Sequence, residues 1–321
     1  MDSDGSVSAF DAASGSGTGT PTPRRTRTAA PMSAAAWPWP GPPSTPPPAA
    51  ARCWPSRPAT GQDHLALPAR RAGPLRAHRG GGAAVRHDAR RADVALAVPD
   101  GKRLWSFQAT AAATSVLGEP APAYSDGLVV GGFGSGDLVA LRAESGSLAW
   151  SDSLAAARGQ TSLAELSAIR ALPVIVDNVV YAIGVGGLML ALDLRSGRRL
   201  WEREIAGQYT PWVAGGWIFV LNQDQMLVCL DRADGHVRWT SQMPHYEEPE
   251  KERDPIYWVG PTLGGQSLYL AGSTEKLIAV NPANGDIVHE EDLPAKASVA
   301  LVAAMGKLFV VTDDATLSAL G

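Results

Sequence analysis

One short pattern recurs along the chain and constrains the fold more than any other feature. In the copy at residues 179–201, apolar segments of alternating character are joined by glycine-rich turns, and the last segment carries a tryptophan. Apolar residues at period two, interrupted by turn residues, predict antiparallel β-hairpins. In each copy a large side chain follows the turn glycine by four residues, at Gly101 and Trp105, Gly146 and Trp150, Gly197 and Trp201, Gly235 and Trp239, and Gly285 and His289.

The spacing of these copies indicates a β-propeller. Successive turn glycines lie 45, 51, 38 and 50 residues apart, which is room for four short strands and their turns. We predict an all-β fold of four-stranded antiparallel blades at about 119–153, 170–205, 211–241 and 257–290, with three more strands in 299–320. Third-strand signals near residues 10, 54, 96, 140, 191, 229, 279 and 319 imply an eight-bladed ring that is incomplete in this chain.

The two repeated residue types have different physical reasons. A tight turn needs a residue that adopts positive φ, and glycine does so without steric cost. A large ring at a fixed place on each outer strand fills the gap between neighbouring blades. We therefore expect the four tryptophans to be buried between blades, with His289 as a packing substitute in the last copy.

Composition excludes several classes of protein. The chain has 321 residues, 45% of them hydrophobic, but no run approaches the roughly 18 apolar residues of a membrane span. Its two cysteines, Cys53 and Cys229, form neither a disulfide framework nor a zinc motif. A net charge of −4 argues against generic nucleic-acid binding. The first residues lack the basic and apolar regions of an export signal.

The N-terminal third departs from the repeat. Residues 1–98 contain twelve arginines and six aspartates but neither lysine nor glutamate, and 14 of the 25 prolines fall in 21–91. Proline cannot donate to a strand ladder, so we expect three regions: a blade fragment at 1–16, an irregular segment at 17–91 that contributes no regular blade, and propeller blades at 92–321. A genuine disordered Pro/Arg-rich insert is one origin for the middle region.

A reading-frame error is the origin that we favour. Residues 6–15 are a good copy of a third strand and its turn, and the next copy, expected near residue 58, is missing. The codons for residues 37–41, Trp-Pro-Trp-Pro-Gly, spell Ala, an apolar residue and Ala when read from each third base. This resembles the strand end at 212–215. We interpret about 17–91 as translated out of frame.

The repeat unit LxALDxxSGxxxW resembles the pyrroloquinoline-quinone-like propeller repeat. Residues 161–201, 207–230 and 254–265 are similar to the BamB family of outer-membrane assembly lipoproteins, and a weaker likeness extends over 92–321 and 6–15. The resemblance implies an eight-bladed, non-catalytic scaffold on the periplasmic face of the outer membrane, held by a lipid on an N-terminal cysteine. It also implies a protein partner, the barrel-forming subunit BamA, and neither a cofactor nor a small-molecule substrate. This chain shows no lipobox cysteine.

A quinone-dependent dehydrogenase is the alternative, because such enzymes share the blades. They hold quinone over the central channel with tryptophan stacking, an adjacent cysteine pair and a calcium ion that needs six or more oxygen ligands. This sequence has no Cys-Cys pair, and its repeat tryptophans are accounted for by packing. We therefore predict no catalytic, cofactor-binding or metal-binding residues.

The resemblance places a partner surface on two neighbouring inter-blade loops. Aligned on Gly118-Glu119 and on Leu166-Ser167, the family's contact positions fall in this chain at Thr114, Val116, Leu117, Glu119, Ala168 and Arg170. The apolar character of the first loop is retained at Val116 and Leu117. The arginine of the first loop and both acids of the second are absent, and Arg170 is positive where the family is negative. Ordinary blade-joining loops are the alternative interpretation.

Three further patterns have structural interpretations that we prefer. The acidic stretch 246–254 is typical of a solvated inter-blade loop, with a partner or cation patch as the alternative. The glycine-rich run 131–136 joins two predicted strands, so it indicates a hairpin turn and not a phosphate loop. The histidines of the predicted blades, His236, His245 and His289, lack metal-ligand spacing.

Overall fold

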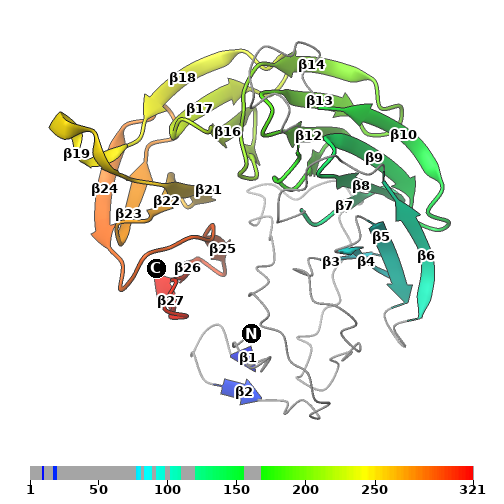
Figure 1. Ribbon diagram of the computed structural model, residues 1–321, viewed down its shortest axis with the longest axis horizontal. Coiled ribbons are helices and arrows are strands. Elements are labelled where there is room, and N and C mark those ends of the chain that lie inside the picture. The colour runs from blue at the N-terminus through cyan, green and yellow to red at the C-terminus, as the bar shows by residue number, and fades with distance from the viewer. Residues whose placement is uncertain are drawn as a thin grey trace.

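The structure is a computed structural model that describes residues 9–10, 17–19, 77–80, 83–88, 92–97, 102–109, 120–154 and 168–320. Six antiparallel sheets, here blades A to F, lie side by side along an arc (Figure 1). Blade A comprises β3 (Ala77–Gly80), β4 (Ala83–Asp88), β5 (Ala92–Ala97) and β6 (Arg103–Gln108). Blade B comprises β7 (Ala123–Ser125), β8 (Leu128–Gly132), β9 (Asp137–Arg142) and β10 (Leu148–Ser153). Blade C comprises β11 (Val174–Val176), β12 (Val179–Ile183), β13 (Met189–Asp193) and β14 (Arg199–Arg203).

The remaining blades follow the same order along the chain. Blade D comprises β15 (Trp212–Ala214), β16 (Trp217–Leu221), β17 (Met226–Asp231) and β18 (Val237–Gln242). Blade E comprises β21 (Trp258–Gly264), β22 (Ser267–Gly272), β23 (Lys276–Val280) and β24 (Ile287–Asp292). Blade F has three described strands, β25 (Val302–Ala304), β26 (Lys307–Val311) and β27 (Leu317–Leu320). Two separate hairpins complete the fold: β1 (Ala9–Phe10) with β2 (Gly17–Gly19), and β19 (Tyr246–Glu248) with β20 (Arg253–Pro255) around the 3-10 helix η1 (Pro249–Lys251).

One strand register repeats from blade to blade. A small residue of the third strand lies opposite the ring position of the fourth, and a register shift follows one residue later. The pairs are Ala95 with Trp105, Ala140 with Trp150, Ala191 with Trp201, Cys229 with Trp239, and Ala279 with His289. The hairpin β1–β2 has the same register, with Ala9 opposite Gly19. It therefore has the backbone pairing of a third and a fourth strand.

The all-β propeller predicted from the repeat is confirmed. The blades at 123–153, 174–203, 212–242, 258–292 and 302–320 fall within a few residues of their predicted bounds. Segment 131–136 contains the last two residues of β8 and the turn that joins β8 to β9, so the predicted hairpin turn is confirmed. No helix in the described ranges is long and apolar enough to cross a membrane. The described strands make six blades and two separate hairpins, so the eight-bladed ring stays a prediction.

The expectation that 17–91 contributes no blade strand is wrong for residues 77–88. Strands β3 and β4 pair with each other, and β4 pairs with β5, so blade A has four strands and its first strand begins at Ala77, upstream of the predicted residue 92. Pro74 is the last proline of the segment, so the residues from Ala77 to Asp88 include none that would interrupt a strand ladder. Small residues in β4 weaken the alternation, but Val85 is buried against Ala95 and Trp105. A frame error remains a prediction for the residues upstream of β3.

The tryptophan ring of each fourth strand packs against the turn of the next blade, here called the tryptophan latch. A Cβ atom added at Gly146, Gly197, Gly235 or Gly285 would lie 2.6–2.8 Å from the nearest atom of the preceding ring. Each ring Nε1 also donates a hydrogen bond to a carbonyl of that turn: Trp105 to Ala143, Trp150 to Leu194, Trp201 to Arg232, and Trp239 to Pro282, at 2.7–3.1 Å. Glycine with positive φ is required because the ring occupies the space of a side chain.

Burial of the rings is confirmed for three of the four. Trp105, Trp150 and Trp201 are buried, and Trp239 is half-buried. The expectation that His289 packs in place of the buried tryptophan is wrong, because its side chain is exposed. Among the described residues, blade F provides no turn between a third and a fourth strand to cover it.

Candidate partner interface

Backbone hydrogen bonds divide the loops of the propeller between two faces. On the first, here the linker face, the segment that enters each blade bonds to the turn between a second and a third strand. Its bonds include Ile169 N–H to Phe133 O, Val185 N–H to Ala168 O, and Gly207 N–H to Gly184 O, at 3.0–3.1 Å. On the opposite turn face, the other two turns of blades B, C and D bond to each other, as in Leu194 N–H to Asn178 O at 2.8 Å.

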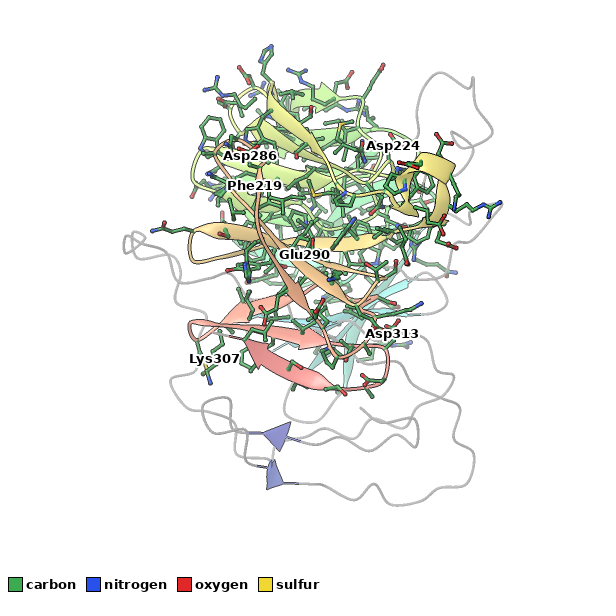
Figure 2. All side chains as sticks on the ribbon, turned by 90° about the vertical axis from the view of Figure 1, so that its left-hand side faces the viewer. Phe219, Asp224, Asp286, Glu290, Lys307 and Asp313 are labelled. Carbon is green, nitrogen blue, oxygen red and sulfur yellow. The ribbon has the colours of Figure 1, made fainter. Side chains whose placement is uncertain are left out.

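Figure 2 shows both faces in a side view. Asp224 and Asp313, from turns of the linker face, lie on one side, and Asp286 and Lys307, from turns of the turn face, lie on the other. The linker between β10 and β11 contains Ala168 and Ile169, whose backbone bonds place the described part of the second predicted loop on the linker face. The first predicted loop, after β6, lies outside the described residues.

Two of the predicted partner residues can be placed. Thr114, Val116, Leu117 and Glu119 lie outside the described residues. Ala168 is 2% exposed, and its carbonyl accepts the hydrogen bond from Val185, so its side chain offers no contact surface. Ala168 is therefore excluded as a side-chain contact, which alignment alone could not show.

The guanidinium of Arg170 is held by a neutral hydrogen-bond partner and not by a carboxylate. Its Nη1 donates to Gln208 Oε1 at 3.0 Å, from one blade linker to the next. A second bond joins the same linkers, from Leu172 N–H to Thr210 Oγ1 at 3.2 Å. Arg170 forms no ion pair with any residue in the described ranges. The guanidinium is thus oriented by a neutral amide and keeps its charge available to a partner.

Tyr209, beside Gln208, anchors this linker. Its half-buried ring packs against clusters shared by blades D, E and F. Burial raises the pKa of its hydroxyl above the ordinary value, with a hydrogen bond to Gln208 and the charge of Arg170 acting against the rise. The phenol is therefore neutral at physiological pH, and Arg170 is the charged group at this position.

A cavity of about 410 Å³ lies farther along the linker face, between blades C and D. Its lining includes Gly187, Glu204, Asn222 and Asp224. Within the described ranges, no group of three or more His, Cys, Asp or Glu side chains is placed to hold a metal ion. The cavity therefore presents two carboxylates and amide groups but no recognisable catalytic constellation.

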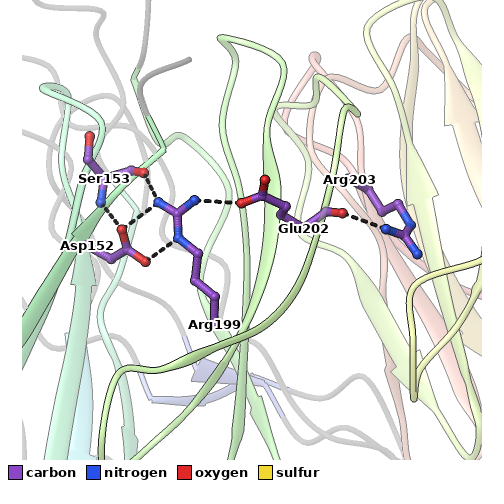
Figure 3. Close-up of polar contacts among 5 residues, drawn as sticks. All are labelled: Asp152, Ser153, Arg199, Glu202 and Arg203. Atoms are coloured by element: carbon purple, nitrogen blue, oxygen red, sulfur yellow. Dashed lines mark hydrogen bonds and ion pairs between the residues drawn. The ribbon is translucent and has the colours of Figure 1, made fainter. Parts of the chain in front are cut away.

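Ion pairs join the fourth strands of neighbouring blades (Figure 3). Arg199 of β14 binds Asp152 of β10 through two hydrogen bonds of 2.6 and 2.7 Å, and it also bonds to Glu202 and to the Ser153 carbonyl. Burial acts to raise the pKa of Asp152, but the hydrogen bonds from Arg199 and the Ser153 amide bring it below its ordinary value. Sequence analysis missed this pair, because its partners lie 47 residues apart.

A second set of clamps holds the turn face. Arg232 of blade D reaches Asp177 at 2.7 Å and the Tyr181 hydroxyl at 3.0 Å, both in blade C. Arg195 of blade C pairs with Asp126 of blade B in the same way. Arginines at the end of successive third strands were the available sequence signal. These arginines form ion pairs with carboxylates of a neighbouring blade, whereas Arg170 does not.

The acidic stretch 246–254 is a hairpin rather than a simple loop. Strands β19 and β20 pair around η1, and most of their residues are exposed. At its base Ile256 N–H bonds to the His245 carbonyl at 2.8 Å, and Trp258 Nε1 bonds to the Pro244 carbonyl at 2.7 Å. The hairpin is therefore solvated, as predicted, but rooted in the core between blades D and E.

These observations define a class of protein, a β-propeller of pyrroloquinoline-quinone-like repeats whose blades are latched by tryptophan. The profile of the family "Outer membrane protein assembly factor BamB" matches residues 72–241 and 252–321. The chain belongs to the BamB family. The match begins just before β3, in agreement with the assignment of β3 and β4 to blade A.

Individual relatives and solved structures agree with this assignment. BamB of Yersinia pestis is 37% identical over 148 residues, which is 46% of this chain and 37% of that protein. The crystal structure of BamB from Moraxella catarrhalis matches with a TM-score of 0.67 at 19% identity, covering 76% of this chain and 70% of that one. The chain spans about half the length of the curated relatives that it matches.

Two dehydrogenases of known structure share the fold. A europium-containing methanol dehydrogenase matches with a TM-score of 0.56 at 12% identity, over 76% of this chain and 66% of that one. At this identity the likeness shows the fold alone. The curated relatives named above are assembly factors.

Proposed function

We propose that this protein is a non-catalytic scaffold that aids insertion of outer-membrane proteins by binding the barrel-forming subunit BamA. The support is membership of the BamB family, whose profile covers all six described blades. By this proposal the propeller works at the periplasmic face of the outer membrane. Membrane contact then comes through the complex, or through a lipid anchor carried by the full-length protein.

The proposed contact is the linker face on either side of blade B. By sequence, Val116 and Leu117 are the apolar residues of the first linker, and Arg170 is the charged residue of the second. Buried apolar area contributes about 25 cal/mol per Å² and is little affected by salt. Because the acids of the family are absent here, docking should depend more on apolar burial than on charge steering.

Val116→Asp combined with Leu117→Asp tests this contact. We expect the double variant to lose co-purification with a BamA periplasmic fragment while its melting temperature stays within about 2 °C of the parent, because surface substitutions change stability little. Met305→Asp is the matched control, since Met305 is 75% exposed on the turn face. Undiminished binding by the double variant, or loss of binding by the control, would place the interface elsewhere.

The enzyme alternative has its own test. If the protein is a scaffold, adding pyrroloquinoline quinone and Ca²⁺ should change neither its absorbance spectrum nor its melting temperature. A saturable spectral change, or a rise in melting temperature that grows with ligand concentration, would favour a bound cofactor instead.

A further inference from the structure

The cavity between blades C and D combines two kinds of lining. Its volume of about 410 Å³ lies within the range of pockets that hold small ligands. One part of the lining is apolar and includes Ile205, Val228 and Val237. The other part carries the carboxylates of Glu204, which follows β14, and Asp224, in the turn between β16 and β17. The cavity therefore offers a ligand both apolar surface and negative charge.

The two carboxylates are not neutralised within the described structure. Glu204 and Asp224 are exposed, and neither forms an ion pair with a residue in the described ranges. Figure 2 shows Asp224 at the surface of the linker face. Among the described residues that line the cavity there is no lysine, arginine or histidine. The lining is therefore negatively charged, with no compensating cation in the part of the chain that the structure describes.

Two arginines that adjoin the lining in sequence bind other groups. Arg203 donates from Nε to the Gly235 carbonyl at 2.8 Å and from Nη2 to the Asp234 carbonyl at 2.6 Å. The Cζ atom of Arg238 lies 5.0 Å from the centroid of the Trp217 ring, over its face. Because both guanidinium groups have partners within blade D, we expect the charge that complements the cavity to come from a ligand.

The lining determines which class of ligand fits. An anion is disfavoured, because both charged groups of the lining are acidic. A calcium ion needs six or more oxygen ligands, and the described ranges contain no group of three or more His, Cys, Asp or Glu side chains placed to hold a metal. A cation at the end of an aliphatic chain matches both parts of the lining, since its methylene groups pack on apolar surface while its charge faces the carboxylates.

We propose that this cavity binds an arginine side chain donated by a partner protein. Its methylene groups would lie against Ile205, Val228 and Val237, and its guanidinium would bind Glu204 and Asp224. Arginine fits better than lysine, because a planar guanidinium has several N–H donors in a fixed arrangement that suits carboxylates. The proposal goes beyond the contact with BamA and does not rest on it, since that contact uses the linkers that flank blade B.

Methyl NMR tests the site directly, with N-acetyl-arginine methylamide as the probe. In protein labelled at the isoleucine and valine methyl groups, we expect saturable shift changes at Ile205, Val228 and Val237 as the probe is added. The citrulline analogue has the shape of arginine without its charge. It should bind at least about tenfold more weakly, because the charge-assisted hydrogen bonds are lost.

Glu204→Gln combined with Asp224→Asn should weaken binding of the arginine probe by about the same factor. Both side chains are exposed, so the double variant should fold as the parent does. Glu247→Gln combined with Glu250→Gln is the matched control, because it removes the same charge from exposed positions of the hairpin at 246–254. This control should bind the probe as the parent does.

Four results would overturn the proposal. Absence of saturable shifts at the three methyl-bearing residues would show that the cavity does not admit the side chain, as would be the case if another part of the chain filled it. Equal binding of the citrulline analogue would show that charge is not recognised. Equal weakening in the hairpin control would show attraction to the net charge of the protein only. Saturation by putrescine at a lower concentration than by the arginine probe would assign the cavity to a free diamine and not to a partner protein.

Discussion

Trp201→Ala is the substitution whose cost follows most directly from the packing between blades. The ring is buried between blades C and D, lies 6.0 Å from the Tyr181 ring centroid, and donates to the Arg232 carbonyl at 3.1 Å. Removing a buried tryptophan side chain typically costs about 3–5 kcal/mol, because burial is lost and a cavity remains. Loss of the hydrogen bond adds about 1 kcal/mol. We therefore expect the upper half of that range in urea denaturation followed by circular dichroism.

Two further variants separate the latch from general effects of tryptophan removal. Trp217→Ala is the matched control, because Trp217 is 37% exposed, and its cost should be about 1 kcal/mol or less. Gly235→Ala should cost about 1–3 kcal/mol, since its Cβ would lie 2.8 Å from the Trp201 ring at a φ of 72°. In the double variant the clash between the new Cβ and the ring is absent. The cost of the double variant should therefore be about 1 kcal/mol less than the sum of the two single costs.

The latch hypothesis fails on either of two results. Equal denaturation midpoints for Trp201→Ala and the parent would show that the ring does not stabilise the blade interface. Strict additivity of Trp201→Ala and Gly235→Ala would show that the glycine is not required by the ring.

Two other predictions concern ionisable groups. Arg199→Gln should cost about 1 kcal/mol at neutral pH, as partly exposed bidentate pairs do. Because the folded pKa of Asp152 lies below its ordinary 3.8, the stabilisation is complete above that pH and is lost as the pH falls through the folded value. Equal pH dependence of denaturation in variant and parent below pH 4 would contradict it. Burial raises the pKa of Cys229 to about 11, so in a Cys53→Ser background the native protein should react with a thiol reagent at neutral pH far more slowly than the protein in urea. Equal rates would refute burial of that thiol.

The fold was predictable because its signals are local. The glycine that needs positive φ and the ring four residues later are both visible in the sequence, and Gly197 and Trp201 occupy the expected positions. Strands β3 and β4 were missed because alanine and glycine give weak alternation. Only pairing with β5 and burial of Val85 identify them.

The site was less predictable, since it depends on how separate blades meet. Ala168 follows Leu166-Ser167 as the family pattern suggests, but its side chain is buried, and its carbonyl accepts a hydrogen bond from Val185. The pairing of Arg170 with Gln208 joins consecutive linkers and has no signature in either segment. His289 was misassigned because the repeat shows which position holds a ring but not whether the next blade covers it.

Photo-crosslinking in cells tests the proposed function most directly. A benzophenone amino acid replaces either Val116, in the first loop of the proposed contact, or Arg170, on the linker face beside blade B, and the same group in place of Met305 lies on the turn face. The account predicts a crosslink to the BamA subunit from positions 116 and 170 and none from position 305. A crosslink to that subunit from position 305 alone, or from none of the three, would contradict it.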